Sequence, residues 1–393
     1  WLMRRTELLQ EIRKMRFEEA YEGWNAGRLT QAEAAAILGM SERNFRRYLV
    51  RFEADGLDGL IDRRLEQMSN RRAPVDEVLA LTDLYRHRHR GWNVKHFHVW
   101  YRRDGGSRSY SWVKKHLQAA GLIEKGKQKG AHRKKRERMP LPGMMIHQDG
   151  SRHAWVPDQM WDLIVTMDDA TNAHYDMRFV EEEGTASSFL GMRTVILNRG
   201  LPCTFYSDRG SHYWTTPEAG GKVDKQNPTQ FGRALRQLGV EMIPAYSPEA
   251  RGRSERAFAT HQDRLPKELA IAGITDMATA NRYLAEAYRP QFNAEFAVPA
   301  REEGSAFVPW IGGNLDDILC EQIERKVGND NCVKFEGLNL QIPADRHRCN
   351  YVKANVRVHR YPDGSLAIFH GPRKLASYTA EGKPITTELK QAA

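Results

Sequence analysis

The sequence predicts a multidomain protein with two all-α modules at its N-terminus, a central α/β domain and a small C-terminal β-barrel. Three observations support this. Apolar residues recur at helical spacing over 17–123, short apolar strands alternate with helices from Met144, and short strands separated by Gly or Pro turns follow residue 330. A length of 393 residues suits several domains. The expected boundaries are 1–68, 69–123, 124–142, 143–312 and 313–393.

Composition limits the class of protein. Apolar residues make up 40% and charged residues 28%, which is typical of soluble globular proteins. We expect no membrane span, because no apolar run approaches ~18 residues, and no secretory leader is visible. The four scattered cysteines argue against a disulfide scaffold and favour the reducing cytoplasm.

Positive charge is concentrated in the N-terminal third of the chain. The net charge is +10, with 31 Lys and Arg against 18 Asp and Glu over residues 1–139 and 29 against 32 over the remainder. A basic N-terminal region followed by a near-neutral body is typical of a DNA-binding module attached to another domain. The alternative is that the surplus of basic residues only keeps the protein soluble.

Residues 30–49 have the layout of a helix-turn-helix. Thr30 with Glu33 forms a capping box, Gly39 makes the turn, and Ser41 caps the next helix. That helix is expected to bury Phe45, Tyr48 and Leu49 and to direct its polar side chains outward. The outward set is Arg43, Asn44, Arg46, Arg47 and Arg51. Such groups suit phosphate and base-edge contacts in the major groove, although a helical hairpin with a solvated basic face would look similar.

A second helical unit is expected over 75–123, with helices near 75–85, 93–101 and from Ser107. Its candidate DNA contacts are Arg108, Lys114 and Lys115. Two tandem modules would read adjacent stretches of one DNA site. The histidines between His87 and His98 lack the spacing of a closed zinc site, so no metal is expected there.

The linker over 124–142 is basic, and its densest cluster is Arg133, Lys134, Lys135 and Arg136. It reads either as a solvated tether or as a segment that follows DNA phosphates.

The central region should form an open sheet with helices on its faces. The expected elements are strands at 144–156, 162–168 and 174–180, a helix at 186–198, a strand at 203–208, a helix at 231–238, a strand at 240–245 and a long helix from Glu255. The later strands, at 333–335, 338–342, 356–359 and 366–369, should close the β-barrel.

Three acids stand where such a sheet exposes its working edge. Asp149 lies on the first strand, Asp208 ends a later strand, and Glu255 begins a helix. Converging carboxylates supply the hard oxygen ligands that two Mg²⁺ ions prefer, with Mn²⁺ as a substitute, and two such ions can promote phosphoryl transfer. Gly210 would allow a sharp turn after Asp208, and Gly252 would give backbone freedom before Glu255.

At these residues the chain resembles the DDE transposases and integrases of the ribonuclease H-like fold. Asp208, Gly210 and Tyr213 match the family pattern Asp-x-Gly-x-x-aromatic, and Pro248, Gly252 and Glu255 match Pro-x-x-x-Gly-x-x-Glu. The chain looks most like bacterial insertion-sequence transposases of the unclassified group, which also carry tandem helix-turn-helix units. The catalytic resemblance covers about 144–300, and with both modules it extends over most of the chain.

Two features depart from the family pattern. Asp208 and Glu255 are separated by 46 residues, more than is common, and the excess maps to 214–229. The position seven residues after the Glu, where many members have Lys or Arg to hold the DNA end, is Gln262 here. We count Gln262 and Arg256 as supporting residues of the site. The resemblance makes Asp168 and Asp169 a structural feature of the second strand rather than ligands.

The resemblance implies a transposase that binds double-stranded DNA at terminal inverted repeats and joins those ends to target DNA. Catalysis would use Mg²⁺ held by Asp149, Asp208 and Glu255, in a homodimer or a larger synaptic assembly. Two alternatives stay open. One is a DNA-binding regulator derived from such an enzyme, and the other is a nuclease of the same fold that cuts without joining.

Overall fold

The computed structural model describes residues 5–62, 73–124, 137–218, 221–246, 252–344 and 348–385. The chain divides into two compact units, Trp1–Arg86 and His87–Ala393. Each unit is described by itself below. Among the described helices, none combines the length and the apolar character that crossing a membrane requires.

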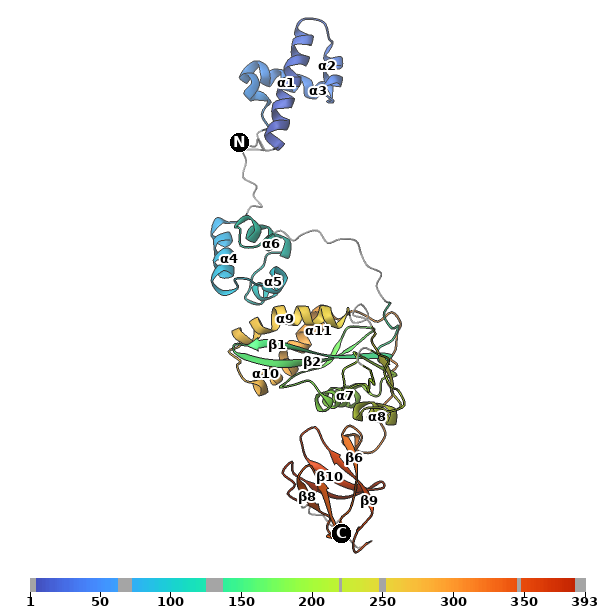
Figure 1. The fold of residues 1–393 in the computed structure, drawn as a ribbon. Coiled ribbons are helices and arrows are strands. Elements are labelled where there is room, and N and C mark those ends of the chain that lie inside the picture. The colour runs from blue at the N-terminus through green and yellow to red at the C-terminus, as the bar shows by residue number, and fades with distance from the viewer. Residues whose placement is uncertain are drawn as a thin grey trace, which may run out of the picture. The chain divides into compact units, whose positions relative to one another are not determined.

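The N-terminal unit contains the predicted helix-turn-helix (Figure 1). Helices α1 (Arg5–Asn25), α2 (Gln31–Ile37) and α3 (Glu42–Asp55) enclose a core that includes Phe17 and Phe45. Thr30 forms the capping box at the start of α2, and the Ser41 side chain caps α3. The turn between them uses Gly39 at a φ of +65°, which glycine adopts without strain. The short-range chemistry of the sequence is therefore confirmed here.

The second set of helices also forms as predicted. Helix α4 (Val75–Arg88) is followed by α5 (Val94–Arg103) and α6 (Tyr110–Ala119). The side chain of Asn93 caps α5, and that of Ser109 caps α6.

The central domain is a five-stranded mixed sheet with strand order β3-β2-β1-β4-β5. Strands β1 (Met145–Val156), β2 (Gln159–Asp168) and β3 (His174–Val180) pair antiparallel in sequence order. Strands β4 (Thr204–Ser207) and β5 (Glu241–Pro244) add parallel to β1. Three antiparallel strands followed by crossover connections give the open α/β sheet that the sequence predicted.

Helices cover both faces of this sheet (Figure 1). Helices α7 (Thr185–Arg199) and α8 (Gln230–Gln237) pack on one face, in a core that includes residues of β1 and β4. Helices α9 (Ser254–Ile271), α10 (Met277–Tyr283) and α11 (Arg289–Phe296) pack on the other face against β2 and β3. The sheet is thus buried on both sides, which leaves its strand ends as the accessible edges.

Helix α9 contains a proline, Pro266, in its interior. Proline has no N–H, so the carbonyl of Gln262 one turn earlier lacks its usual helical hydrogen bond. Helices α10 and α11 are joined by a π-helical turn, Leu284–Tyr288.

A buried carboxylate on α9 binds helix α5. Glu268 accepts hydrogen bonds from His96 Nε2 (2.7 Å) and Trp100 Nε1 (3.0 Å) of α5 and from the Tyr283 hydroxyl (2.9 Å). Trp92 stacks on the His96 ring at 4.2 Å between centroids. Burial alone would raise the pKa of Glu268, but these three hydrogen bonds hold it below its usual value.

The C-terminal region is rich in strands, but the described strands do not close a barrel. Strands β6 (Glu321–Lys326), β9 (Asn355–Arg360), β10 (Leu366–His370) and β11 (Arg373–Tyr378) form an open sheet of order β11-β10-β9-β6. Strands β7 and β8 form a separate hairpin over residues 332–341. Both sheets contribute to one core. The prediction of a closed β-barrel is therefore corrected to two open sheets packed together.

Candidate active site and nucleic-acid interface

Asp149 and Asp208 both follow the short stretch over which β1 and β4 run parallel. The last residues paired between these strands are His147 and Tyr206. Asp149 follows two residues later on β1, and Asp208 directly follows the last residue of β4. Besides burial, the charges of both carboxylates raise the pKa of the Tyr213 hydroxyl, so both lie within electrostatic reach of that hydroxyl. Asp149 is 8% exposed and Asp208 is half-buried. Two of the three predicted acids thus come from neighbouring parallel strands of the sheet.

Tyr213, the aromatic residue of the Asp208 motif, is a core residue. Its ring is 1% exposed, and its hydroxyl donates to Gln148 Oε1 (3.0 Å), next to Asp149. Burial raises the pKa of Tyr213 well above its usual value, and the negative charges of Glu183, Asp149 and Asp208 act in the same direction. The hydroxyl of Tyr213 thus lies in a region of negative electrostatic potential.

Gly210 supports Asp208 in a way that the sequence did not predict. Its backbone N–H donates to Asp208 Oδ1 (2.9 Å). Its φ is not positive, so the expected glycine-specific turn is not the reason for this residue. Space is the reason, because a Cβ at this position would lie 3.1 Å from that same carboxylate oxygen and 3.0 Å from His212 Cε1.

Glu255 lies in the first turn of α9 and is exposed. Gly252 precedes the helix, and its carbonyl accepts a hydrogen bond from Nε of the exposed Arg256 (3.2 Å). Within the described residues, no three His, Cys, Asp or Glu side chains are grouped so that they could hold a metal ion. Asp149, Asp208 and Glu255 are therefore not gathered into such a group. Pro248 of the Glu255 motif lies outside the described residues.

Two contacts fix the position of α9 against the sheet. Gln262 Nε2 donates to Ser151 Oγ (2.9 Å), two residues after Asp149 on β1. Arg253, two residues before Glu255, forms an ion pair with the fully buried Asp169. Gln262, at the position where many family members hold the DNA end, therefore anchors α9 to β1.

Asp169 and its neighbour Asp168 have structural partners, in keeping with the role that the resemblance implied. Asp169 accepts from His147 Nε2 (2.7 Å) and from the backbone N–H of Met139 (2.8 Å). Although burial acts to raise the pKa of Asp169, the hydrogen bond and charge of His147 hold it well below its usual range. Asp168 accepts from Gly143 N–H (2.9 Å).

The sequence did not single out Glu183, whose charge acts on the Tyr213 hydroxyl together with those of Asp149 and Asp208. A Cβ on Gly150, the residue after Asp149, would lie 2.3 Å from Glu183 Oε2. Glu183 Oε1 is 3.5 Å from His212 Nε2. The local signal was weak, because Glu183 is the last of three consecutive glutamates before α7 and matches no motif.

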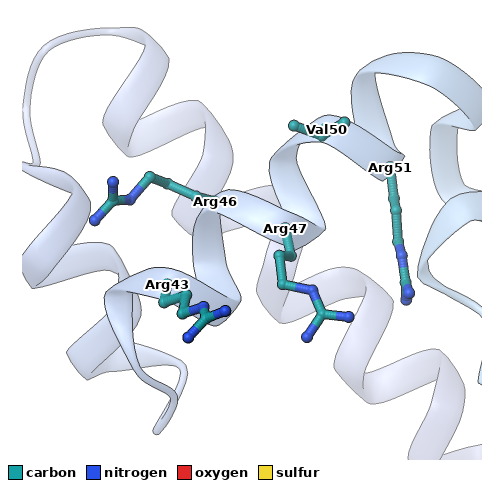
Figure 2. A pocket seen from close by; sticks show the side chains of 5 residues that line it. All are labelled: Arg43, Arg46, Arg47, Val50 and Arg51. Atoms are coloured by element: carbon teal, nitrogen blue, oxygen red, sulfur yellow. The ribbon is translucent and has the colours of Figure 1, made fainter.

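The basic face of α3 is the second candidate site, and Figure 2 shows its side chains. Four of the five predicted contacts line one open hollow of about 410 Å³, together with a valine: Arg43, Arg46, Arg47, Val50 and Arg51. Asn44 is exposed in the first turn of α3 but does not line the hollow. The sequence therefore predicted the arginines that gather here, but it did not predict Val50.

The remaining predicted DNA contacts are more dispersed. Lys114 and Lys115 are exposed on α6, and the Arg108 guanidinium lies over the Trp112 ring at 5.2 Å. The linker residues Arg133, Lys134, Lys135 and Arg136 lie outside the described residues.

Comparison with known families and proteins gives three kinds of match. Residues 20–76 match the family model described as winged helix-turn helix. A Sinorhizobium fredii protein named "Putative transposase y4bF" is 31% identical over 352 residues, which cover 87% of this chain and 75% of that protein. The transposase for insertion sequence IS1202 of Streptococcus pneumoniae is 30% identical over 235 residues, covering 59% of this chain and 50% of that protein.

Solved retroviral structures are also similar. A simian T-cell lymphotropic virus intasome in complex with PP2A regulatory subunit B56 gamma aligns at 14% identity and a TM-score of 0.34, covering 78% of this chain and 99% of that chain. The HTLV-2 integrase catalytic core domain in complex with magnesium (dimeric form) aligns at 15% identity and a TM-score of 0.29, covering 39% of this chain and 97% of that chain. Because both TM-scores are low, the description of the fold rests on the strand order given above.

Proposed function

Because this chain belongs to the transposase family of the two bacterial relatives, we propose that it binds the ends of a mobile element and joins them to target DNA. The reaction would be phosphoryl transfer at an Asp149, Asp208 and Glu255 triad. The observation that supports this proposal is the parallel pairing of β1 and β4, which ends two residues before Asp149 on one strand and two residues before Asp208 on the other.

The donor set of the site fits a divalent metal. Asp149 and Asp208 offer carboxylate oxygens, which Mg²⁺ prefers, at one edge of the sheet. Glu255 would complete the set from the first turn of α9. When bound to these three residues, two Mg²⁺ ions would activate the attacking oxygen and stabilise the leaving oxygen.

The surrounding residues would restrict how the acids move. The N–H of Gly210 holds Asp208 Oδ1, and the Tyr213 hydroxyl ties the Asp208 loop to Gln148 on β1. Arg253 and Gln262, on either side of Glu255 in the sequence, hold α9 in place by binding Asp169 and Ser151. Such pre-organisation lowers the entropic cost of reaching the reactive geometry.

The proposed chemistry has two displacements at phosphorus. In the first, water attacks the phosphodiester at the end of the element and the P–O3′ bond breaks, which leaves a free 3′-hydroxyl. In the second, this 3′-hydroxyl loses its proton and attacks a target phosphodiester, whose own O3′ leaves. Neither step needs a covalent enzyme intermediate.

DNA recognition would come from the two sets of helices. The arginines of α3 and the basic residues of α6 would contact the terminal repeats, and the linker arginines and lysines would follow the phosphates. Because two ends must be joined together, the working form would be a homodimer or a larger assembly.

A strand-transfer assay tests this function. Purified protein is incubated with labelled duplex carrying the ends of its own element, with Mg²⁺ or with EDTA. We expect metal-dependent nicking and joined product, both lost in Asp208→Asn, while Asp208→Asn still binds the duplex. Asp263→Asn is the matched control, because Asp263 is on α9 and pairs with Lys267 (2.6 Å).

The assay also separates the alternatives. Specific binding of the ends without nicking, in Mg²⁺ and in Mn²⁺, would refute the enzyme and support a DNA-binding regulator. Nicking without joined product would support a nuclease.

A further inference from the structure

The exposed stripe of α3 combines positive charge with one apolar side chain. The residues of this stripe lie on one side of α3 because they are spaced at i, i+3, i+4, i+7 and i+8. They line the same hollow (Figure 2): Arg43, Arg46, Arg47, Val50 and Arg51. The opposite side of α3 carries Phe45 and Leu49, which are buried in the core of the unit. The stripe is therefore the face of α3 that is available to a ligand.

Val50 is not needed by the core of this unit. It is 67% exposed, although β-branched apolar side chains are usually buried. An isolated exposed valine would need no explanation on an ordinary surface. Here it lies among four arginines that line one hollow, so the hollow offers both positive charge and an apolar contact to a ligand.

The arginines around Val50 are available for exchange with a ligand. Arg46 pairs with Glu42 at 3.3 Å, but both side chains are about half exposed, and such pairs contribute little to stability. Arg51 lies 5.8 Å from the centroid of the Tyr48 ring. No hydrogen bond or ion pair of the Arg43 or Arg47 side chain is found within the part of the chain that the structure describes.

We propose that Val50 contacts the C5-methyl group of a thymine in the major groove. This inference rests on the proposed binding of DNA by α3. Thymine methyls are the apolar groups that the major groove displays between its phosphate backbones, and apolar side chains recognise them by direct contact. Arg46 and Arg47, one turn before Val50, and the adjacent Arg51 contact neighbouring guanine edges or phosphates. Val50 thereby adds a requirement for a thymine to a surface that is otherwise cationic.

The test removes the thymine C5-methyl group from the DNA and, separately, the two γ-methyl groups of Val50 from the protein. A preferred duplex is first selected from random double-stranded DNA with the full chain. Each thymine of that duplex is then replaced singly by deoxyuridine, which lacks only the C5-methyl, and Kd is measured at fixed salt. We expect one position at which the replacement weakens binding about fourfold, the effect of burying one methyl group.

Two protein variants are measured with the same pair of duplexes, so that the effects of the two methyl deletions can be compared. In Val50→Ala, the thymine-to-uracil effect at that position should fall below about twofold, because the contact that depends on the methyl is absent. Ile37→Ala is the matched control, since Ile37 is 62% exposed on α2 and does not line the hollow. It should keep the full effect. Far-ultraviolet circular dichroism verifies that both variants fold.

The outcomes separate the two levels of the proposal. If no duplex is selected, or if Arg47→Gln binds the selected duplex as tightly as wild type, DNA binding by α3 is refuted. If Arg47→Gln weakens binding but every deoxyuridine replacement is neutral, the role of Val50 is refuted while DNA binding stands. The same holds if Val50→Ala keeps the thymine-to-uracil effect.

Discussion

Removal of the Glu268 carboxylate should destabilise the unit formed by residues 87–393 more than any surface substitution on α9. Glu268 is 5% exposed and accepts three hydrogen bonds, from His96, Trp100 and Tyr283. In Glu268→Ala these donors lose their acceptor in a buried site. Removing one side of a buried charged network costs about 3–5 kcal/mol, and an unsatisfied buried donor alone costs about 1–3 kcal/mol.

Equilibrium unfolding in urea, followed by tryptophan fluorescence at pH 7.5, measures this cost. The matched control is Asp263→Ala on the same helix, which breaks the more exposed pair with Lys267 and should cost below about 1 kcal/mol. If the unfolding free energies of Glu268→Ala and Asp263→Ala agree within about 1 kcal/mol, the structural role given to Glu268 is wrong.

The same variant should lose its effect in acid. The pKa of Glu268 is lowered in the folded protein. Its ionised form therefore contributes stability that is fully present above the unfolded pKa of about 4.3 and is lost as pH falls through the folded pKa. The difference in unfolding free energy between wild type and Glu268→Ala should thus shrink below pH 4, and a constant difference would contradict the argument.

Three further predictions concern the core domain. Gly191→Ala should lower Tm by destabilising the fold about 1–3 kcal/mol, because a Cβ would lie 2.2 Å from Gln148 Nε2; a raised Tm, usual for Gly→Ala in a helix, would contradict this. Burial lowers the pKa of His174 to about 4, so below pH 6.5 the unfolded chain takes up a proton that the folded protein does not. The free energy of unfolding should therefore fall by about 2 kcal/mol between pH 7.5 and 5. His174→Gln should lose that part of the pH dependence in urea titrations. Arg253→Gln should reduce nicking and cost about 1.5–3 kcal/mol, because Asp169 keeps its contact with His147 but loses the charged hydrogen bond from Arg253. Arg253→Lys should restore most of both, and an unchanged nicking rate would exclude a positioning role.

Local chemistry was readable from the sequence. The caps Thr30 and Ser41 and the turn at Gly39 define α2 and α3 through contacts within a few residues, so they appear where the sequence predicts them. The strands of the central sheet were also predictable, because buried strands carry dense apolar runs. The order of the strands, with β4 beside β1, depends on pairing between distant segments and leaves no local signal.

The errors have the same origin. The barrel prediction failed because β6, Glu321–Lys326, is a run of mostly polar residues with no strand signal, yet it pairs with β9 and forms the open edge of the sheet. Glu183 was missed because its neighbours come from the Asp149 and Asp208 segments rather than from its own. The reason expected for Gly210 was wrong because the constraint is a neighbouring carboxylate and not the backbone angle.

Pro266 interrupts the hydrogen-bond ladder of α9 between its two sets of anchoring contacts. The segment before Pro266 carries Glu255. It is held against the sheet by two contacts, Arg253 with Asp169 and Gln262 with Ser151. The missing helical bond at Pro266 follows immediately. Beyond it, Glu268 holds α5. If α5 moves, we therefore expect α9 to bend at Pro266, so that the segment carrying Glu255 keeps its position against the sheet.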